Sequence, residues 1–303
     1  MSPVITIIIP HKNSSKLLNR LLVSIPKHED WQVIVVDDHS SEEECNAVKQ
    51  LCKSFDFECY DNPYTTAGGA RNKALEHAKG KWILFADADD YFTTELYEAI
   101  SRNVNSEADI VFFSAISKDS DTGEEAFRNE HIVEMINKYH TTADDGYLRY
   151  KLLAPISKLI RHELITDNNI KFEERPAGND MWFSINTGIA ARKVECDNTA
   201  IYCITIRKGS ITTTISPNLF EHRLQASIRT NKLLRKHKLN KYQISLLYFL
   251  GMSYQFGLKY MLHVAKCVLF SGTSLLIGLN KILKINKVLN DRQNRAKLTR
   301  VKN

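Results

Sequence analysis

The feature that most constrains the fold is a set of short, almost entirely apolar runs in the N-terminal third of the chain. They cover residues 4–9, 32–36 and 82–86, and β-branched residues dominate the first two. Apolar runs of this length without alternation are typical of strands that are buried on both faces, as in parallel sheets. The sequence therefore predicts an α/β fold with a mostly parallel central sheet.

The segments between these runs have helical spacing. Apolar residues recur at positions 17, 18, 21, 22 and 25, which predicts a helix over residues 16–25 and, with its flanking strands, a βαβ unit. Similar reasoning predicts helices over 70–78, 94–103, 131–139 and from Met181 onward, and strands over 109–113 and 194–206. Ser40 followed by Glu43 matches a capping box, so a helix is expected to begin directly after the second run.

Aspartates follow the third run as Asp87-Ala88-Asp89-Asp90. Ligands of open parallel sheets bind at the carboxyl ends of strands, which makes this turn a candidate site. Residues i and i+2 of an extended segment point to the same side, so Asp87 and Asp89 can reach one cation together. Mg²⁺ and Mn²⁺ take one or two protein carboxylates and fill their other positions with water and phosphate oxygens, which suits a nucleotide-diphosphate ligand. The alternative interpretation is a solvated acidic turn.

A second acidic pair, Asp37 and Asp38, follows the second run. These carboxylates could accept hydrogen bonds from a ribose or from the N–H of a pyrimidine base. The alternative is that they complement the dipole of the following helix. His11 and His39 lie near the same edge, and we interpret both as hydrogen-bonding surface residues outside the catalytic set.

The sequence lacks the motifs that are typical of several classes of nucleotide-binding and redox proteins. No G-x-G-x-x-G follows the first run, and no G-x-x-x-x-G-K-[ST] occurs in the chain. The six cysteines form no C-x-x-C pair and no cysteine–histidine pattern with zinc spacing, and no signal-peptide pattern is present at the N-terminus. A reducing, cytoplasmic location is therefore expected.

Four segments together resemble the family 2 glycosyltransferases, the inverting class with the GT-A fold that transfers sugars from nucleotide-diphosphate donors. They are residues 8–13 (IIPHKN), 35–40 (VVDDHS), 67–72 (AGGARN) and 83–90 (ILFADADD), in the order of the family. The resemblance is strong over residues 4–115. It continues more weakly through 155–159 (PISKL), Phe172, Asn179-Asp180 and 207–210 (RKGS).

The resemblance implies a set of donor-binding residues. They are Pro10, Asp37, Asp38, Arg71, Asp87, Asp89, Lys158, Arg207 and Ser210. In this interpretation Asp38 contacts the uracil or ribose, Arg71 the base or the phosphate side, and Asp87 the ribose. Asp89 is implied as the ligand of a divalent metal, Mn²⁺ or Mg²⁺.

Asp180 is implied as the catalytic base. Many family members carry Glu before this aspartate, whereas Asn179 stands here. The structural alternative is that Asn179 or Asp180 caps the helix that begins at this point. A base would take the proton of an acceptor hydroxyl while a cation holds the charge of the departing diphosphate.

Charge divides the chain near Ser216-Pro217-Asn218. From Glu221 to Asn303, 17 lysines and arginines stand against two acidic residues, a net charge of +15, while the rest of the chain carries −9. We expect a GT-A catalytic domain over residues 1–217, with a donor half over 1–115 and an acceptor half over 116–217. A basic amphipathic helical region is expected over 218–303.

The basic region contains two uncharged segments, residues 242–258 and 267–280, that lysines flank. Their length and polar residues make poor membrane spans, but they fit helices that lie in a membrane interface and face anionic lipid. Expected partners are a nucleotide-sugar donor, a lipid-linked or glycan acceptor and the inner face of the cell membrane, bound peripherally. Packing on the catalytic domain or a homodimer contact is the alternative. Nucleic acid is not expected, because no recognisable module accompanies the basic charge.

With the resemblance, these features predict an inverting, metal-dependent glycosyltransferase that uses a UDP-sugar in bacterial surface polysaccharide assembly. One alternative is a phosphatase of the haloacid-dehalogenase type. Its motif requires Thr or Val where Tyr91 stands and normally lies on the first strand. The other alternative is a catalytically silent sugar-nucleotide or glycan-binding protein, which the intact Asp87, Asp89 and Asp180 disfavour.

Overall fold

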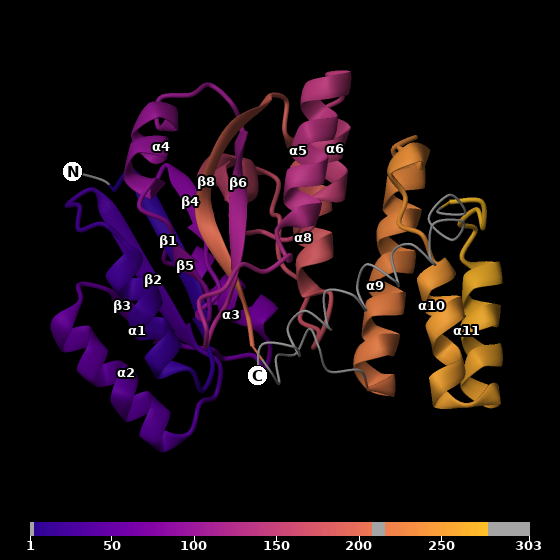
Figure 1. Cartoon of the computed structure of the whole chain (residues 1–303), viewed down its shortest axis with the longest axis horizontal. Coiled ribbons are helices and arrows are strands. Elements are labelled where there is room, and N and C mark those ends of the chain that lie inside the picture. The colour runs from indigo at the N-terminus through magenta and orange to yellow at the C-terminus, as the bar shows by residue number, and fades with distance from the viewer. Residues whose placement is uncertain (1–2, 208–215, 278–303) are drawn as a thin grey trace. The chain divides into compact units, whose positions relative to one another are not determined.

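The computed structural model describes residues 3–207 and 216–277. It divides the chain into two compact units, Met1–Ser216 and Pro217–Asn303 (Figure 1). The first unit is built around a β-sheet with helices packed against it, and the described part of the second unit is helical. The predicted helical C-terminal region is therefore confirmed.

The sheet of the first unit has the strand order β3-β2-β1-β4-β7-β6-β8-β5. In chain order the strands are β1 (Ile5–His11), β2 (Trp31–Asp37), β3 (Glu58–Asp61), β4 (Trp82–Phe85), β5 (Tyr91–Phe92), β6 (Ile110–Asp119), β7 (Lys158–Arg161) and β8 (Val194–Ile206). Strands β3, β2, β1 and β4 pair in parallel, as do β6 and β8, whereas β7 and β5 run antiparallel to their neighbours. The predicted α/β fold with a mostly parallel sheet is confirmed.

The three apolar runs of the N-terminal third are the central strands of this sheet. Ile7, Ile8 and Ile9 of β1 are fully buried, and so are Val35 of β2 and Leu84 of β4. Neighbouring residues of a strand point to opposite faces, so burial of successive residues means that both faces are covered. The same parallel pairing places the ends of β1, β2 and β4 at one edge of the sheet.

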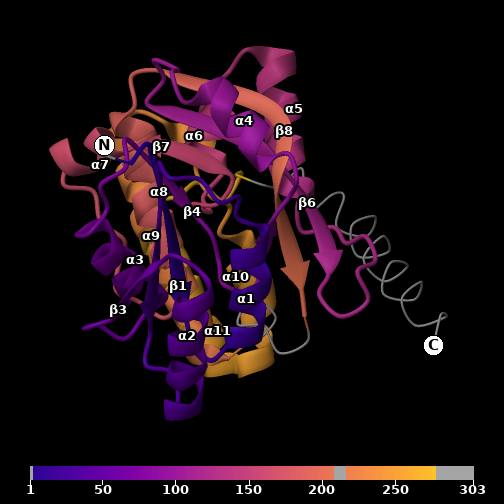
Figure 2. The same ribbon diagram turned by 90° about the vertical axis from the view of Figure 1, so that its left-hand side faces the viewer.

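Eight helices pack on the described part of the first unit (Figures 1 and 2). They are α1 (Ser15–Ser24), α2 (Glu42–Ser54), α3 (Ala67–Leu75), α4 (Leu96–Asn103), α5 (Glu130–Thr142), α6 (Gly146–Lys151), α7 (His162–Asp167) and α8 (Asn179–Ala190). Helix α1 buries Leu18, Leu21 and Leu22, as its spacing predicts. Helix α3 contacts β1, β2 and α8, so it joins the sheet to the beginning of α8.

The predicted capping box at Ser40 is wrong by one residue. The side chain of Ser41 accepts the capping hydrogen bond, from the backbone N–H of Glu44. Ser40 is engaged in the preceding turn, because its backbone N–H donates to Asp37 and its hydroxyl accepts from the backbone N–H of Asn13.

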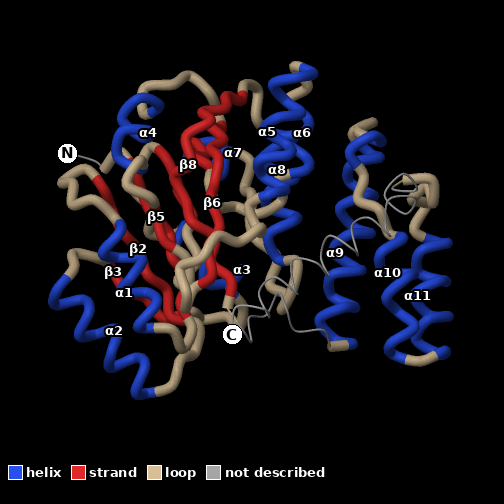
Figure 3. The backbone as a smooth tube through the Cα atoms, in the orientation of Figure 1, coloured by secondary structure: helices blue, strands red, loops and turns tan. Residues whose placement is uncertain are grey.

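The second unit contains three α-helices and two 3₁₀ turns in its described residues (Figure 3). They are α9 (Pro217–Lys236), η1 (Asn240–Tyr242), α10 (Leu247–Met252), η2 (Ser253–Phe256) and α11 (Leu258–Phe270). Their small core consists of Phe220, Leu224, Leu246, Phe249, Val264 and Val268. Over residues 3–207 and 216–277, no helix has both the length and the apolar character needed to cross a membrane. Residues 278–280 of the predicted second apolar segment lie outside the described residues.

Candidate donor-binding and catalytic site

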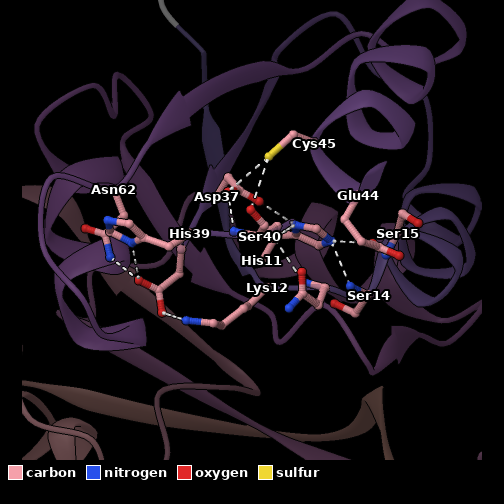
Figure 4. Close-up of polar contacts among 12 residues, drawn as sticks. His11, Lys12, Ser14, Ser15, Asp37, His39, Ser40, Glu44, Cys45 and Asn62 are labelled. Atoms are coloured by element: carbon pink, nitrogen blue, oxygen red, sulfur yellow. Dashed lines mark hydrogen bonds and ion pairs between the residues drawn. The ribbon is translucent and has the colours of Figure 1, made fainter. Parts of the chain in front are cut away.

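His11 anchors the turns at the ends of β1 and β2 (Figure 4). It is 1% exposed, and its Nδ1 lies 3.0 Å from Oδ1 of Asp37. The backbone N–H of Ser14 donates to Nε2 at 3.2 Å, which fits a ring that carries its proton on Nδ1. The interpretation of His11 as a surface residue is wrong, because the parallel register places it directly beside Asp37. His39 is exposed, as interpreted.

Asp37 is held on both carboxylate oxygens by protein donors. Oδ1 contacts His11, and Oδ2 accepts from the backbone N–H of Ser40 at 2.9 Å. The Sγ of Cys45 lies 3.7 Å from the same Oδ2. Burial acts to raise the pKa of Asp37, but the hydrogen bonds from Ser40 and His11 outweigh it and hold the pKa below its usual value of 3.8. Asp37 therefore shapes the turn that presents Asp38.

Asp38 is connected to α3 through Asn62. The Asn62 amide donates to Asp38 Oδ1 at 2.6 Å and to the carbonyl of Thr66 at 3.1 Å. Thr66 is the N-cap of α3, and its hydroxyl accepts from the backbone N–H of Gly69. Lys12 Nζ lies 3.8 Å from the other Asp38 oxygen. The acidic turn after β2 and the start of α3 thus form one hydrogen-bonded corner.

The glycines of the AGGARN segment allow α3 to approach residues 172–180. A Cβ added to Gly68 would lie 2.3 Å from the carbonyl oxygen of Glu173, so this position has no room for a side chain. Asn72 binds Phe172 in both directions: its amide nitrogen donates to the carbonyl at 3.0 Å, and its Oδ1 accepts from the backbone N–H at 2.8 Å. The segment before α8 is therefore fixed against α3.

Arg71 bridges the end of β4 and the beginning of α8. Its guanidinium is almost fully buried; Nη2 lies 2.5 Å from Asp87 Oδ1, and Nη1 donates to Asn179 Oδ1 at 3.3 Å. Its carbon Cζ lies 5.4 Å from the centre of the Phe172 ring. One side chain thereby brings together two segments that lie far apart in the sequence.

Asp180 lies in the first turn of α8, directly after Asn179. The helix N-cap position is Gly178, with φ +71°, and it makes no side-chain cap. The predicted capping role is wrong for both polar residues, because they lie inside the helix and the Asn179 side chain binds Arg71 and the carbonyl of Arg175. Burial raises the pKa of Asp180, Arg71 acts to lower it, and Asp87 acts to raise it. Asp180 therefore lies in the same electrostatic environment as the turn after β4.

Lys158, the first residue of β7, is buried beside this group. Its Nζ donates to the carbonyl of Leu152 at 2.6 Å and lies 5.3 Å from the centre of the Phe112 ring. Burial lowers the pKa of Lys158 to about 7, while the nearby Asp180 acts to raise it. The opposite charges of Lys158 and Asp180 therefore partly offset the effect of burial on the pKa of each group.

The turn after β4 presents two carboxylates that are partly exposed. The backbone N–H of Asp87 donates to Tyr202 Oη at 2.8 Å, and Asp89 Oδ2 lies 3.3 Å from Arg207 Nε. Thr205 Oγ1 donates to the Asp89 carbonyl at 2.6 Å. Burial and the neighbouring Asp87 raise the pKa of Asp89 above 3.8. Two carboxylates that repel each other in this way fit a divalent cation, which would neutralise both.

The last aspartate of this turn has a different surrounding. Asp90 is 4% exposed and accepts a hydrogen bond from the backbone N–H of Thr205 at 2.7 Å. Burial and the charge of Asp87 raise the pKa of Asp90 to about 8. The side chain is therefore oriented toward β8 and holds the turn in place.

The structure thus groups the predicted residues in two neighbouring sets. Asp87, Asp89, Asp180, Arg71 and Lys158 form one, joined by contacts and by mutual effects on pKa. Asp38 with Asn62 forms the other, which α3 links to the first. Arg207 joins the first set through Asp89, and Pro10 lies in β1 opposite Val36 of β2. Ser210 lies outside the described residues.

Sequence reasoning missed the supporting residues of both sets. His11, Asn62 and Tyr202 position the acidic turns. His11 follows a buried strand directly, and that position could have indicated its burial. A cavity of about 710 Å³ lies elsewhere, beside Ile25, Trp31 and Phe55 near the amino end of β2, away from the carboxylates.

Comparisons with known proteins point to one family. The family model for "Glycosyl transferase family 2" matches residues 6–166, more than half of the chain. "Putative glycosyltransferase EpsH" of Bacillus subtilis is 24% identical over 82% of this chain and 74% of its own length. TarS of Staphylococcus aureus, a poly(ribitol-phosphate) beta-N-acetylglucosaminyltransferase, is 26% identical over 67% of this chain. The chain spans only 36% of the length of TarS.

Solved structures show the same fold. TarS 1–349 in complex with UDP-GlcNAc superposes with a TM-score of 0.63 at 22% identity, covering 79% of this chain and 70% of that one. The mannosyltransferase PcManGT of Pyrobaculum calidifontis, in complex with GDP-Man and Mn²⁺, has a TM-score of 0.51 at 14% identity over 94% of this chain and 81% of its own. These likenesses confirm the GT-A fold. With the family match over the sheet and its acidic turns, the chain belongs to glycosyl transferase family 2.

Proposed function

We propose that this glycosyltransferase transfers a sugar, with inversion, from a UDP-sugar to a glycan or lipid-linked acceptor in bacterial surface polysaccharide synthesis. The observation that carries the proposal is the Arg71 bridge between Asp87 and Asn179. The bridge places the first turn of α8, with Asp180, beside the acidic turn after β4. The proposed donor-binding residues and the proposed base, Asp180, then belong to one site.

The donor would bind at the edge formed by the ends of β1, β2 and β4. Asp38 can accept a hydrogen bond from the uracil or the ribose, and its loop is already positioned by His11, Asp37 and Asn62. Arg71 contacts Asp87 and Arg207 contacts Asp89, so positive charge lies next to both carboxylates. Asp89, with Asp87 beside it, would hold a divalent cation, Mn²⁺ or Mg²⁺, which when bound neutralises the diphosphate charge.

Asp180 would act as the general base. The acceptor oxygen forms a bond to the anomeric carbon, the bond from that carbon to the diphosphate oxygen breaks, and the hydroxyl proton passes to the Asp180 carboxylate. Attack from the face opposite the departing diphosphate inverts the anomeric centre. Burial suits Asp180 to this role, because it raises the pKa of the carboxyl against the opposing effect of Arg71 and Lys158, and a raised pKa makes Asp180 a stronger base than an exposed carboxylate.

Relatives support the class of donor and acceptor. TarS has been solved with UDP-GlcNAc and with UDP. WfaP of Escherichia coli is a glucosyltransferase whose name gives a UDP-Glc donor and a diphosphoundecaprenol acceptor, and it is 36% identical over 29% of this chain. A UDP-sugar and a lipid-linked acceptor are therefore the choices we propose for this chain.

We propose further that the second unit binds the inner face of the cell membrane. Leu258, Leu262 and Leu269 of α11 are 66%, 59% and 68% exposed and lie on one stripe of the helix. Lys259 and Lys266 flank this stripe. A different side of α11, with Val264 and Val268, is buried in the core of the unit. A helix with an outward apolar stripe beside lysines is typical of interfacial binding to anionic lipid.

A calorimetric titration of UDP and UDP-sugars, with and without Mn²⁺, tests the donor site. We expect binding that depends on Mn²⁺ in the wild type and is weakened at least tenfold in Asp89→Asn. Asp121→Asn, an exposed aspartate of the turn after β6, is the matched control and should bind as the wild type does. Binding that is equal with and without the metal would contradict the role of Asp89.

A further inference from the structure

Three side chains of metal-binding type meet in the second unit, on α9 and α11. They are Glu221 of α9 and His263 and Cys267 of α11, and their ligand atoms lie within 4.8 Å of one another. This group belongs to neither of the residue sets described above, and it is independent of the proposed sugar transfer. It cannot be recognised from the sequence alone, because Glu221 lies 42 positions from His263 and only His263 and Cys267 lie close together in the chain.

The spacing of the three residues suits a small tetrahedral cation. His263 and Cys267 are at i and i+4 of one helix, so they lie one turn apart on the same face. Nε2 of His263 lies 3.2 Å from Glu221 Oε2 and 3.7 Å from the Sγ of Cys267. Ligand atoms around a tetrahedral zinc ion with bonds of about 2.0 to 2.3 Å lie roughly 3.3 to 3.8 Å apart. Small side-chain adjustments would therefore bring all three into coordination.

The carboxylate of Glu221 is already oriented by its neighbours. Tyr260 Oη donates to Oε2 at 3.0 Å, and Gln225 Nε2 donates to Oε1 at 2.7 Å. Supporting hydrogen bonds of this kind are what orient ligands in metal sites. Glu221 is also one of only two acidic residues between positions 221 and 303, in a region with 17 lysines and arginines. This carboxylate nevertheless lies beside a histidine and a cysteine.

We propose that Glu221, His263 and Cys267 bind a divalent cation of the zinc class, with water in the fourth position. Histidine nitrogen, thiolate sulfur and carboxylate oxygen are the ligands that zinc takes in proteins. Binding replaces the thiol proton of Cys267, which passes to the solvent, with the bond from sulfur to the metal. The bound ion ties the N-terminal part of α9 to α11 and so stabilises the small core between them.

Titration of the full-length protein with Co²⁺ tests this site, because cobalt bound to a thiolate in tetrahedral geometry has distinctive absorption bands. We expect a thiolate-to-cobalt charge-transfer band and intense visible bands in the wild type, with one equivalent bound. Cys267→Ser should lose the charge-transfer band, and His263→Ala should weaken binding at least tenfold. The control Cys59→Ser, on β3, should keep the wild-type spectrum.

The variant Asp89→Asn separates this site from the proposed donor metal site, because it should keep the cobalt spectrum even if it no longer binds the donor. In a parallel measurement, Zn²⁺ should raise the midpoint of thermal unfolding of the wild type and of Cys59→Ser, but not that of Cys267→Ser. A wild-type protein without thiolate bands, or bands that persist in Cys267→Ser, would overturn the proposal.

Discussion

At Asp180, burial and the neighbouring cations act on the carboxyl pKa in opposite directions. Burial raises the pKa, whereas Arg71 and Lys158 act to lower it. Asp180 thus combines a buried position with partners that favour its ionised form. Such a combination is typical of a general base.

Asp180→Asn should remove most sugar transfer and leave donor binding intact. An amide cannot take the acceptor proton, and general-base catalysis typically contributes 10² to 10⁴-fold, so turnover should fall by about 10²-fold or more. Turnover and calorimetric UDP affinity measured on the same preparation separate the two effects. If the variant turns over at a near-normal rate, the base lies elsewhere.

Arg71→Met should move the acidic limb of the pH–rate profile to higher pH. Arg71 acts to lower the pKa of Asp180, so its removal leaves that pKa higher. A base works in its ionised form, and the rate rises as the pH passes upward through its pKa; a higher pKa therefore shifts this rise upward. Arg128→Met, at an exposed position, is the control. An acidic limb at the same pH in both variants would argue against coupling of Arg71 to the base.

Single residues also mark the limit of prediction from sequence. The positions of Asp87 and Asp89 at the end of a buried strand followed from the apolar run before them. The burial of His11 did not, because it depends on the neighbouring strand placing Asp37 beside it. Residue type indicated which side chains were candidates for the site. The pairing of β1 with β2 determined that His11 is buried and holds Asp37.

Among the elements, α3 connects the two halves of the site. Its glycines allow close packing, Asn72 binds Phe172, and Arg71 reaches both Asp87 and Asn179. The sequence predicted a helix over 70–78, and the structure places it at Ala67–Leu75. The early start matters, because it puts Gly68 inside the helix and against the carbonyl of Glu173.

Gly68→Ala should destabilise the first unit and weaken donor binding. The added Cβ would meet the Glu173 carbonyl oxygen at 2.3 Å, and relief of such overpacking typically costs about 1 to 3 kcal/mol. Chemical denaturation measures the loss. Gly251→Ala in α10 is the matched control, because nothing lies within 4 Å of its added Cβ, and it should be neutral or stabilising by about 0.5 to 1 kcal/mol. Equal effects of both substitutions would contradict the close approach of α3.

Three short strands, β3, β5 and β7, were not predicted from the sequence. Strand β7 has four residues, yet it lies between β4 and β6 and runs antiparallel to both. The charged residues at both ends of β7, Lys158 and Arg161, leave too few apolar positions to separate a strand from a loop. Strand β3, with four residues, and β5, with two, likewise contain too few apolar positions. The strands that are buried on both faces, including β4 with four residues, were predictable because most of their residues are apolar.

On the scale of the whole molecule, the chain combines an acidic α/β unit with a basic helical unit. Of the twelve large hydrophobic residues that are exposed in the described part of the chain, eight lie in the second unit. Single exposed hydrophobic residues are normal on a protein surface, but eight in one small unit are more than the other unit shows. Together with the basic charge, these eight residues favour a membrane surface as the partner of the second unit.

Replacing Leu262 and Leu269 together by serine should weaken binding to vesicles rich in phosphatidylglycerol. Burial of one leucine is worth roughly 1.5 to 3 kcal/mol, so loss of two should lower partitioning by at least tenfold. Vesicle sedimentation measures this, and added salt should also release the wild type because lysines contribute. Val23→Ser, at an exposed position of α1, is the control. A wild-type protein that does not sediment with the vesicles but dimerises through these leucines would contradict membrane binding.

We propose that acidic turns far apart in the sequence converge on one metal-bound diphosphate, with Asp180 beside it. Anomalous diffraction from crystals grown with Mn²⁺ and UDP tests this convergence. We expect an anomalous peak in coordination distance of the Asp89 carboxylate, the uracil or ribose at Asp38, and the Asp180 carboxylate facing the diphosphate. A manganese peak away from Asp89, or UDP bound where Asp180 cannot face it, would show that these residues do not form one site.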